Sequence, residues 1–146
     1  MARPLTDPDV LKSVLASNKI QASKALGQNF LICEEVIQSA LIALEGGPKN
    51  ITELGPGVGT LTQGLISNGY LVRAIEKDDD FVKLLPGMML TKLRQNLEII
   101  HGDLKEEEWE YSQPSSAKAT AANNGYAIVG NIPYNLSGFI IRRLTK

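Results

Sequence analysis

The sequence predicts an α/β fold built on a parallel sheet. Short apolar runs alternate with stretches of helical period, and glycine or proline separates most of them. Strands that alternate with helices at this spacing are typical of parallel sheets, because a crossover helix must carry the chain back to the starting end of the next strand. The 146 residues are enough for one domain and short for two.

The expected elements follow from period and from breakers. Strands are predicted over 50–54, 70–76, 97–103 and 126–130, and helices over 6–17, 34–45, 60–68, 78–85, 88–95 and from 135 onward. Thr6 and Asp9 have capping-box spacing, so the first helix is expected to start at Thr6. Pro86 and Gly87 are expected to interrupt the helix that begins at Asp78.

Composition excludes several classes of protein. The net charge of −1 and the pI near 5.8 give no general electrostatic attraction to nucleic acid, so any RNA-binding surface must be local. Cys33 cannot form an internal disulfide and is expected to be buried, and no Cys/His cluster predicts a metal site. No apolar stretch approaches the roughly 20 residues that span a bilayer. We therefore expect a cytoplasmic protein with no membrane partner and no metal.

The stretch ELGPGVGT, residues 53–60, predicts a nucleoside site. It joins a strand to a helix, and Gly55, Gly57 and Gly59 let a ligand approach the backbone closely. Glu76 ends the next strand, 17 positions after Gly59, where a carboxylate can accept hydrogen bonds from two ribose hydroxyls. The alternative interpretation of Glu76 is a surface acid that caps the following helix.

The acids indicate which nucleoside. A dinucleotide site has G-x-G-x-x-G spacing, whereas this loop has G-x-G-x-G and follows Glu53. An acid at that position suits a cationic or zwitterionic ligand, and S-adenosylmethionine fits. Asp103 can accept from an adenine amino group with Leu104 beside the ring, although a simple Gly-Asp turn is an alternative for Asp103.

The stretch VGNIPYNLS, residues 129–137, predicts a site for methyl transfer to an adenine amine. The Asn131 side-chain oxygen and the Ile132 carbonyl can accept the two N–H bonds of that amine, which favours a pyramidal nitrogen. Pro133 fixes the backbone, and Tyr134 offers a face on which an unpaired or flipped base can stack. Catalysis of this kind is orientation and electrostatics, without a nucleophile or a metal. The alternative is an Asn-Pro-type turn with a tyrosine in the core.

These motifs together resemble those of the ribosomal RNA adenine dimethyltransferases, most closely the small-subunit type that dimethylates two adjacent adenines. The resemblance covers most of residues 19–143 and rests on five motifs in order: KALGQNFLI (24–32), ELGPGVGTLT (53–62), the strand end at Glu76, HGDL (101–104) and GNIPYNLS (130–137).

The resemblance implies a fold, an activity and further site residues. It implies a Rossmann-like methyltransferase sheet that uses S-adenosylmethionine to dimethylate the exocyclic amine of adenines in 16S ribosomal RNA, with the small ribosomal subunit as partner and a role in ribosome biogenesis. It also implies that the stretch at Gln28, Asn29 and Leu31 folds over the methionine end of the cofactor. The remaining matched cofactor positions are Gly55, Glu76, Asp103 and Asn131, and Asn131 also touches the target amine.

The family pattern continues beyond what this sequence contains. Further strands, a later aromatic that sandwiches the target base and a small helical RNA-binding domain are missing, so residues 1–146 match the N-terminal part of the catalytic domain and the sheet stops after its fourth strand. We therefore expect either a dimer, for which swapping of elements is one route, or partial disorder beyond residue 136. Weak cofactor binding and little or no turnover are expected for the same reason.

Three other functions remain open at the level of the sequence. Methylation of large-subunit (23S) RNA, as in the resistance methyltransferases, uses the same chemistry. The stretch ELGPGVGTLT favours the small-subunit type over this alternative. A non-catalytic RNA-binding or ribosome-assembly factor could keep the fold, although Asn131 and Tyr134 argue against it. A nicotinamide-dependent oxidoreductase is disfavoured by the glycine spacing.

Overall fold

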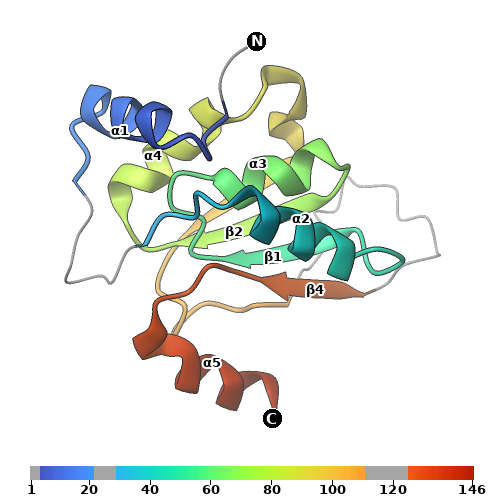
Figure 1. Cartoon of the computed structure of the whole chain (residues 1–146). Coiled ribbons are helices and arrows are strands. Elements are labelled where there is room, and N and C mark those ends of the chain that lie inside the picture. The colour runs from blue at the N-terminus through green and yellow to red at the C-terminus, as the bar shows by residue number, and fades with distance from the viewer. Residues whose placement is uncertain (1–3, 22–28, 111–124) are drawn as a thin grey trace.

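The computed structural model describes residues 4–21, 29–110 and 125–146, and its centre is one sheet of four parallel strands. The strand order is β3-β2-β1-β4 (Figure 1). The strands are β1 (Asn50–Leu54), β2 (Leu71–Glu76), β3 (Leu97–His101) and β4 (Tyr126–Val129). The predicted α/β fold is confirmed, and each strand lies within two residues of its expected bounds.

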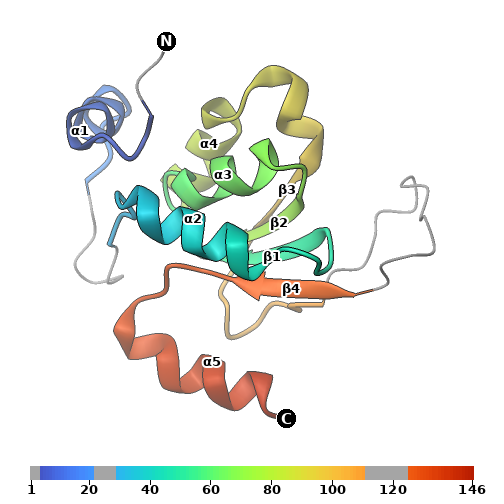
Figure 2. The same cartoon turned by 45° about the vertical axis from the view of Figure 1, so that its right-hand side comes forward.

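Helices cover both faces of the sheet. The helices α2, α3 and α4 lie on one side and α5 on the other, as the two views agree (Figures 1 and 2). No helix within the described ranges is long and apolar enough to cross a membrane. The bounds are α1 (Pro8–Ser17), α2 (Glu34–Ala43), α3 (Thr60–Ser67), α4 (Asp79–Met88) and α5 (Ser137–Leu144), with short 3₁₀ helices η2 (Thr91–Asn96) and η3 (Tyr134–Leu136).

The central strand β1 is buried along its whole length because it packs on both faces. Its Ile51 lies in a cluster with side chains of α2, α3 and α4. On the opposite face, Leu54 packs with Trp109 and with Ile140 of α5. The alternation of strand side chains between faces divides the core into these two layers.

Three local predictions are wrong for identifiable reasons. Asp7, not Thr6, caps α1, since the Asp7 carboxylate accepts from the backbone N–H groups of Asp9 and Val10. The helix α4 continues through Pro86 to Met88; the proline removes one N–H from the hydrogen-bond ladder, and only two helical residues follow it. Cys33 is exposed, and its thiol donates to Glu35 at 3.1 Å. The sequence also indicates loops over 18–32 and 105–125, and the parts of these loops at 22–28 and 111–124 lie outside the described residues.

The register aligns the carboxyl ends of all four strands at one edge of the sheet. Glu76 of β2 pairs with His101 of β3, and Glu53 of β1 pairs with Val129 of β4. The chain moves outward from β1 to β3 and then returns to β4 on the other side of β1. Ligands of open α/β sheets bind at such a reversal point, outside the carboxyl ends of the strands.

The loop after β1 requires glycine at position 59, and this gives a stability prediction. Gly59 has φ +88°, and a Cβ there would lie 2.4 Å from Leu85 Cδ1. We expect Gly59→Ala to lower the free energy of unfolding by about 2–4 kcal/mol, measured by urea denaturation, through left-handed strain and overpacking.

The matched control is Gly87→Ala in α4, where a Cβ would meet nothing within 4 Å. This variant is expected to be neutral or slightly stabilising, because alanine has the higher helix propensity. Equal stability of the two variants would contradict the role assigned to Gly59.

Candidate functional site

A cavity of about 270 Å³ opens at the carboxyl edge of the sheet, close to the lower end of the usual range for small-molecule sites. Its walls come from residues 29–31, the loop after β1, the ends of β2 and β3, and the segment 131–136. These segments lie far apart in the sequence, and the parallel register brings them together at the reversal between β1 and β4.

Glu76 fixes the shape of the glycine-rich loop. Its carboxylate accepts from the backbone N–H of Gly57 at 3.0 Å and from that of Asp78 at 2.9 Å. Glu76 is only 7% exposed, and the N-cap of α4 is Asp78, so the alternative of a surface capping acid is wrong. Burial raises the pKa of Glu76, and hydrogen bonds from the backbone N–H groups of Asp78, Gly57 and Lys77 lower it.

The loop leaves room for a ligand. Gly55 has φ +67°, lines the cavity and has open space where a Cβ would stand. A Cβ on Gly57 would lie 3.9 Å from the ring of Phe30, which also makes an edge contact with Phe81 of α4. The segment that contains Phe30 is therefore packed over the loop, where it closes one side of the cavity.

Thr60, the first residue of α3, carries an unsatisfied hydroxyl. Thr60 lines the cavity and is 6% exposed, yet its Oγ1 has no hydrogen-bond partner among the described residues. A buried hydroxyl normally has a partner, because desolvation without one is costly. Together with the open space at Gly55, the hydroxyl gives the cavity an unused donor and acceptor beside the N-terminus of α3.

Glu53 is the deepest acid of the site. It is 1% exposed, lines the cavity and accepts from the Thr62 hydroxyl at 2.7 Å. Burial raises the pKa of Glu53 to about 7; the Thr62 hydrogen bond lowers it and the nearby charge of Glu76 raises it. A cation in the cavity would favour the ionised form, so the site is suited to a positively charged ligand.

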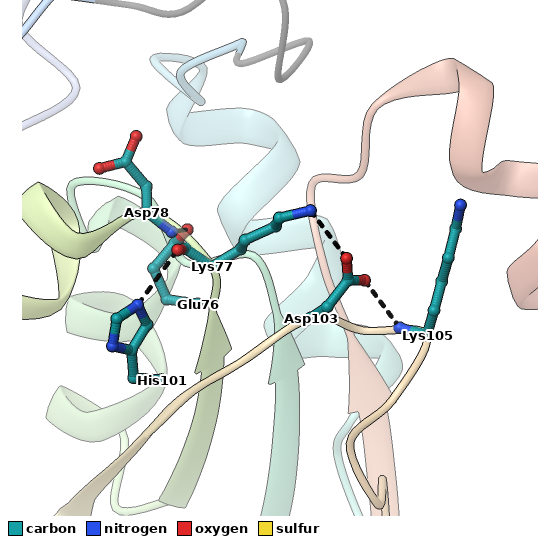
Figure 3. A network of polar contacts seen from close by, with 6 residues as sticks. All are labelled: Glu76, Lys77, Asp78, His101, Asp103 and Lys105. Carbon is teal, nitrogen blue, oxygen red and sulfur yellow. Dashed lines mark hydrogen bonds and ion pairs between the residues drawn. The ribbon is translucent and has the colours of Figure 1, made fainter.

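Asp103 follows the end of β3 and lines the cavity, and its carboxylate lies between Lys77 and Lys105 (Figure 3). Its Oδ1 accepts from the backbone N–H of Lys105 at 2.9 Å, and its Oδ2 lies 2.8 Å from the ammonium of Lys77. These contacts, the Lys77 hydrogen bond first, hold the pKa of Asp103 below its usual value. Asp103 therefore forms the expected turn and also presents an ionised carboxylate to the cavity, with lone pairs still available.

Asn131 follows β4 and faces the segment at Asn29. Its Nδ2 donates to the Asn29 backbone carbonyl at 2.8 Å. Because that partner can only accept, the bond assigns the orientation of the amide and leaves Oδ1 as an acceptor. Asn131 and Pro133 both line the cavity, beside the loop after β1.

Most of the predicted site residues do meet at this cavity. Those on its wall are Asn29, Leu31, Glu53, Gly55, Gly57, Glu76, Asp103, Leu104, Asn131 and Pro133. Gly59 is not on the wall, because its α carbon faces Leu85 and Met89. Ile132 packs on the core beneath the sheet, and Tyr134 is 94% exposed in η3. Gln28 lies outside the described residues.

Sequence reasoning missed several residues of the wall. Phe30, Thr60 and Lys77 line the cavity. Each is next to a predicted site residue in the sequence, so their position in the chain could have indicated that they belong to the site. Asn135 and Leu136 also line the cavity beyond the predicted NIPY stretch. No local pattern indicates which way these side chains turn, because their direction is set by packing between elements.

The fold and the cavity together define a Rossmann-like nucleoside-binding protein. Glycines follow the first strand, a buried acid ends the second and another acid follows the third, all at one sheet edge. The family model for "Ribosomal RNA adenine dimethylase" matches residues 19–146. The chain belongs to the ribosomal RNA adenine dimethylase family.

Individual relatives agree with this family. The chain is 30% identical over 144 residues to Ribosomal RNA small subunit methyltransferase A of Deinococcus radiodurans, covering 98% of this chain and 45% of that protein. It is 35% identical over 127 residues to the protein of the same name from Mycoplasmopsis pulmonis, covering 87% and 45%. The chain thus spans less than half the length of these relatives.

Solved structures give the same fold. The crystal structure of the 23S rRNA methyltransferase ErmE matches with a TM-score of 0.58 at 27% identity, covering 78% of this chain and 41% of that one. A dimethyladenosine transferase from Plasmodium falciparum matches with a TM-score of 0.51 at 20% identity, covering 98% and 38%. The expectation of a methyltransferase sheet is confirmed.

The buried acid predicts an unusual dependence of stability on pH. Between the ordinary pKa of 4.5 and about 7, Glu53 is ionised in the unfolded chain and protonated in the folded one. Its contribution to the free energy of unfolding therefore falls as pH rises through this window, by on the order of 3 kcal/mol in total, and changes little above it. Glu53→Gln removes this loss, so its stability relative to the unmodified chain should increase from pH 5 to pH 7.5 in urea titrations.

Glu45→Gln, at an exposed carboxylate beyond α2, is the control and should leave the shape of the profile unchanged. Parallel pH profiles for Glu53→Gln and the unmodified chain would show that Glu53 is ionised in the folded protein throughout this range.

Proposed function

We propose that this chain forms the S-adenosylmethionine site and part of the target-amine site of an enzyme that dimethylates adenine N6 in small-subunit (16S) ribosomal RNA. Such an enzyme acts in ribosome biogenesis in the cytoplasm. The observation that carries the proposal is the position of Asn131, an oriented amide acceptor on the wall of an acid-lined nucleoside cavity.

The residues of the cavity fit S-adenosylmethionine. The Glu76 carboxylate is suited to ribose hydroxyls, Asp103 to the adenine amino group, and buried Glu53 to the positive charge of the ligand. Thr60 Oγ1, which lacks a partner among the described residues, is suited to the polar amino-acid end. When bound, the cofactor supplies an electrophilic methyl group.

The chain's own part in the reaction is to hold and orient an amine. Asn131 Oδ1 and the Ile132 carbonyl accept the two N–H bonds of the adenine amine, which turns the nitrogen lone pair away from the ring system. Pro133 has no N–H and a restricted φ, so it keeps this acceptor pair in shape. The exposed ring of Tyr134 is available for stacking on an unpaired base.

The choice of RNA rests on the relatives. Those from Deinococcus radiodurans and Mycoplasmopsis pulmonis are named as small-subunit methyltransferases. The match to ErmE supports a second candidate, methylation of large-subunit (23S) RNA. Both candidates use the same residues, so the assay must separate them by substrate. The dimer expected from the sequence stays a prediction.

Cofactor binding is the first test. Isothermal titration calorimetry of the chain with S-adenosylhomocysteine should give one site, because the acids and the loop are already arranged in the protein. Asp103→Ala should weaken binding by about tenfold or more, through loss of a charge-assisted hydrogen bond. Failure of the unmodified chain to bind would contradict the proposal.

Methyl transfer is the second test, with small-subunit particles and large-subunit RNA offered separately and a radiolabelled methyl donor. At most slow transfer to the small subunit is expected of this chain. Where transfer is measurable, Asn131→Ala should reduce it by about a hundredfold or more through loss of an oriented acceptor. Transfer to large-subunit RNA alone would favour the second candidate. Undiminished transfer by Asn131→Ala would remove the role assigned to Asn131.

A further inference from the structure

Arg143, in the last turn of α5, contacts the segment that follows β3. Its guanidinium donates to three backbone carbonyls of this segment, those of Leu104 at 3.1 Å, Lys105 at 3.4 Å and Glu107 at 2.6 Å. Arg143 is partly buried, whereas the neighbouring Arg142 is exposed. The N–H groups of the Arg143 guanidinium therefore donate to backbone carbonyls of the protein itself.

A tryptophan holds the same segment from a second direction. The Arg143 guanidinium stacks on the ring of Trp109 at 4.4 Å, and the Trp109 indole N–H donates to the Leu104 carbonyl at 3.0 Å. Trp109 is 4% exposed, and its own carbonyl accepts from Thr52 of β1 at 2.8 Å. The Leu104 carbonyl is thus fixed by two donors anchored on α5 and on the sheet.

The segment held in this way is the nucleobase side of the cavity. Asp103, Leu104 and Lys105 line the cavity. The Asp103 carbonyl accepts from the backbone N–H groups of Glu106 and Glu107, so residues 103–107 form one hydrogen-bonded turn. A shift of the carbonyls that Arg143 holds would move this turn and, with it, the Asp103 carboxylate.

We propose that Arg143 is a positioning residue for recognition of the nucleobase. By holding the carbonyls of the turn, it keeps the Asp103 carboxylate where it accepts from the 6-amino group of the cofactor's adenine. Arginine suits this role because its planar fork can reach several carbonyls while its face stacks on an indole. The inference rests on the proposed function, since it assumes an adenosine ligand in this cavity.

The test measures a selectivity that a loss of stability alone would not change. The affinity of S-adenosylhomocysteine is compared with that of its analogue in which hydrogen replaces the 6-amino group, by calorimetry at a temperature where every variant is folded. The unmodified chain should prefer the amino compound by at least about tenfold, the value of a hydrogen bond to a charged acceptor. Arg143→Met should reduce that preference to about threefold or less.

Three further variants complete the test. Arg143→Lys keeps the charge and can donate to one carbonyl, so an intermediate preference is expected. Arg142→Met removes the adjacent exposed charge and should leave the preference unchanged. Asp103→Ala should abolish the preference, which identifies the carboxylate as its source.

Each failure has a distinct meaning. If the unmodified chain binds neither compound, the proposed function fails and this inference fails with it. If the unmodified chain binds both compounds equally, Asp103 does not read the amino group and the role of Arg143 is overturned. If the preference survives in Arg143→Met but is lost in Asp103→Ala, the proposed function stands and Arg143 is not a positioning residue.

Discussion

The hydrogen bonds of Glu76 to the backbone of Gly57 and Asp78 are the contacts on which the site depends. They join the end of β2 to the loop after β1 and to the start of α4, so one carboxylate sets the positions of three segments. The remaining walls are arranged around this loop, with Phe30 packed on Gly57 and Thr60 beginning α3. A ligand therefore meets a loop that is already ordered, which lowers the entropic cost of binding.

The burial of two acids at the same edge of the sheet affects both the charge of the ligand that the cavity suits and the stability of the fold. Glu53 and Glu76 are almost fully buried beside one another, and burial raises the pKa of each. Such an arrangement disfavours ionisation of the two carboxyl groups in the free protein. A cation that enters the cavity would stabilise their ionised forms and would therefore be bound more favourably. The acids thus lower stability at neutral pH and, under the proposed function, would favour a positively charged ligand, a balance that is common at functional sites.

Much of the fold could be read from the sequence because its signals are local. The strand β1 was predicted at its observed bounds, and the meeting of Glu53, Gly55, Glu76, Asp103 and Asn131 follows from parallel strands sharing one carboxyl edge. What could not be read depends on side-chain direction and packing. The contact of Lys77 with Asp103 (Figure 3), the inward placement of Thr60 and the packing role of Gly59 all result from how neighbouring elements approach.

The helix α5 connects two regions that the sequence treats separately. It begins directly after η3. Arg143 in its last turn donates to the backbone carbonyls of the segment that follows Asp103. Eight residues of helix form a short strut of about 12 Å between the segment at Asn131 and the segment at Asp103. If the RNA substrate proposed above displaces this strut, cofactor affinity should change, and thermodynamic reciprocity then requires the cofactor to change RNA affinity by the same factor.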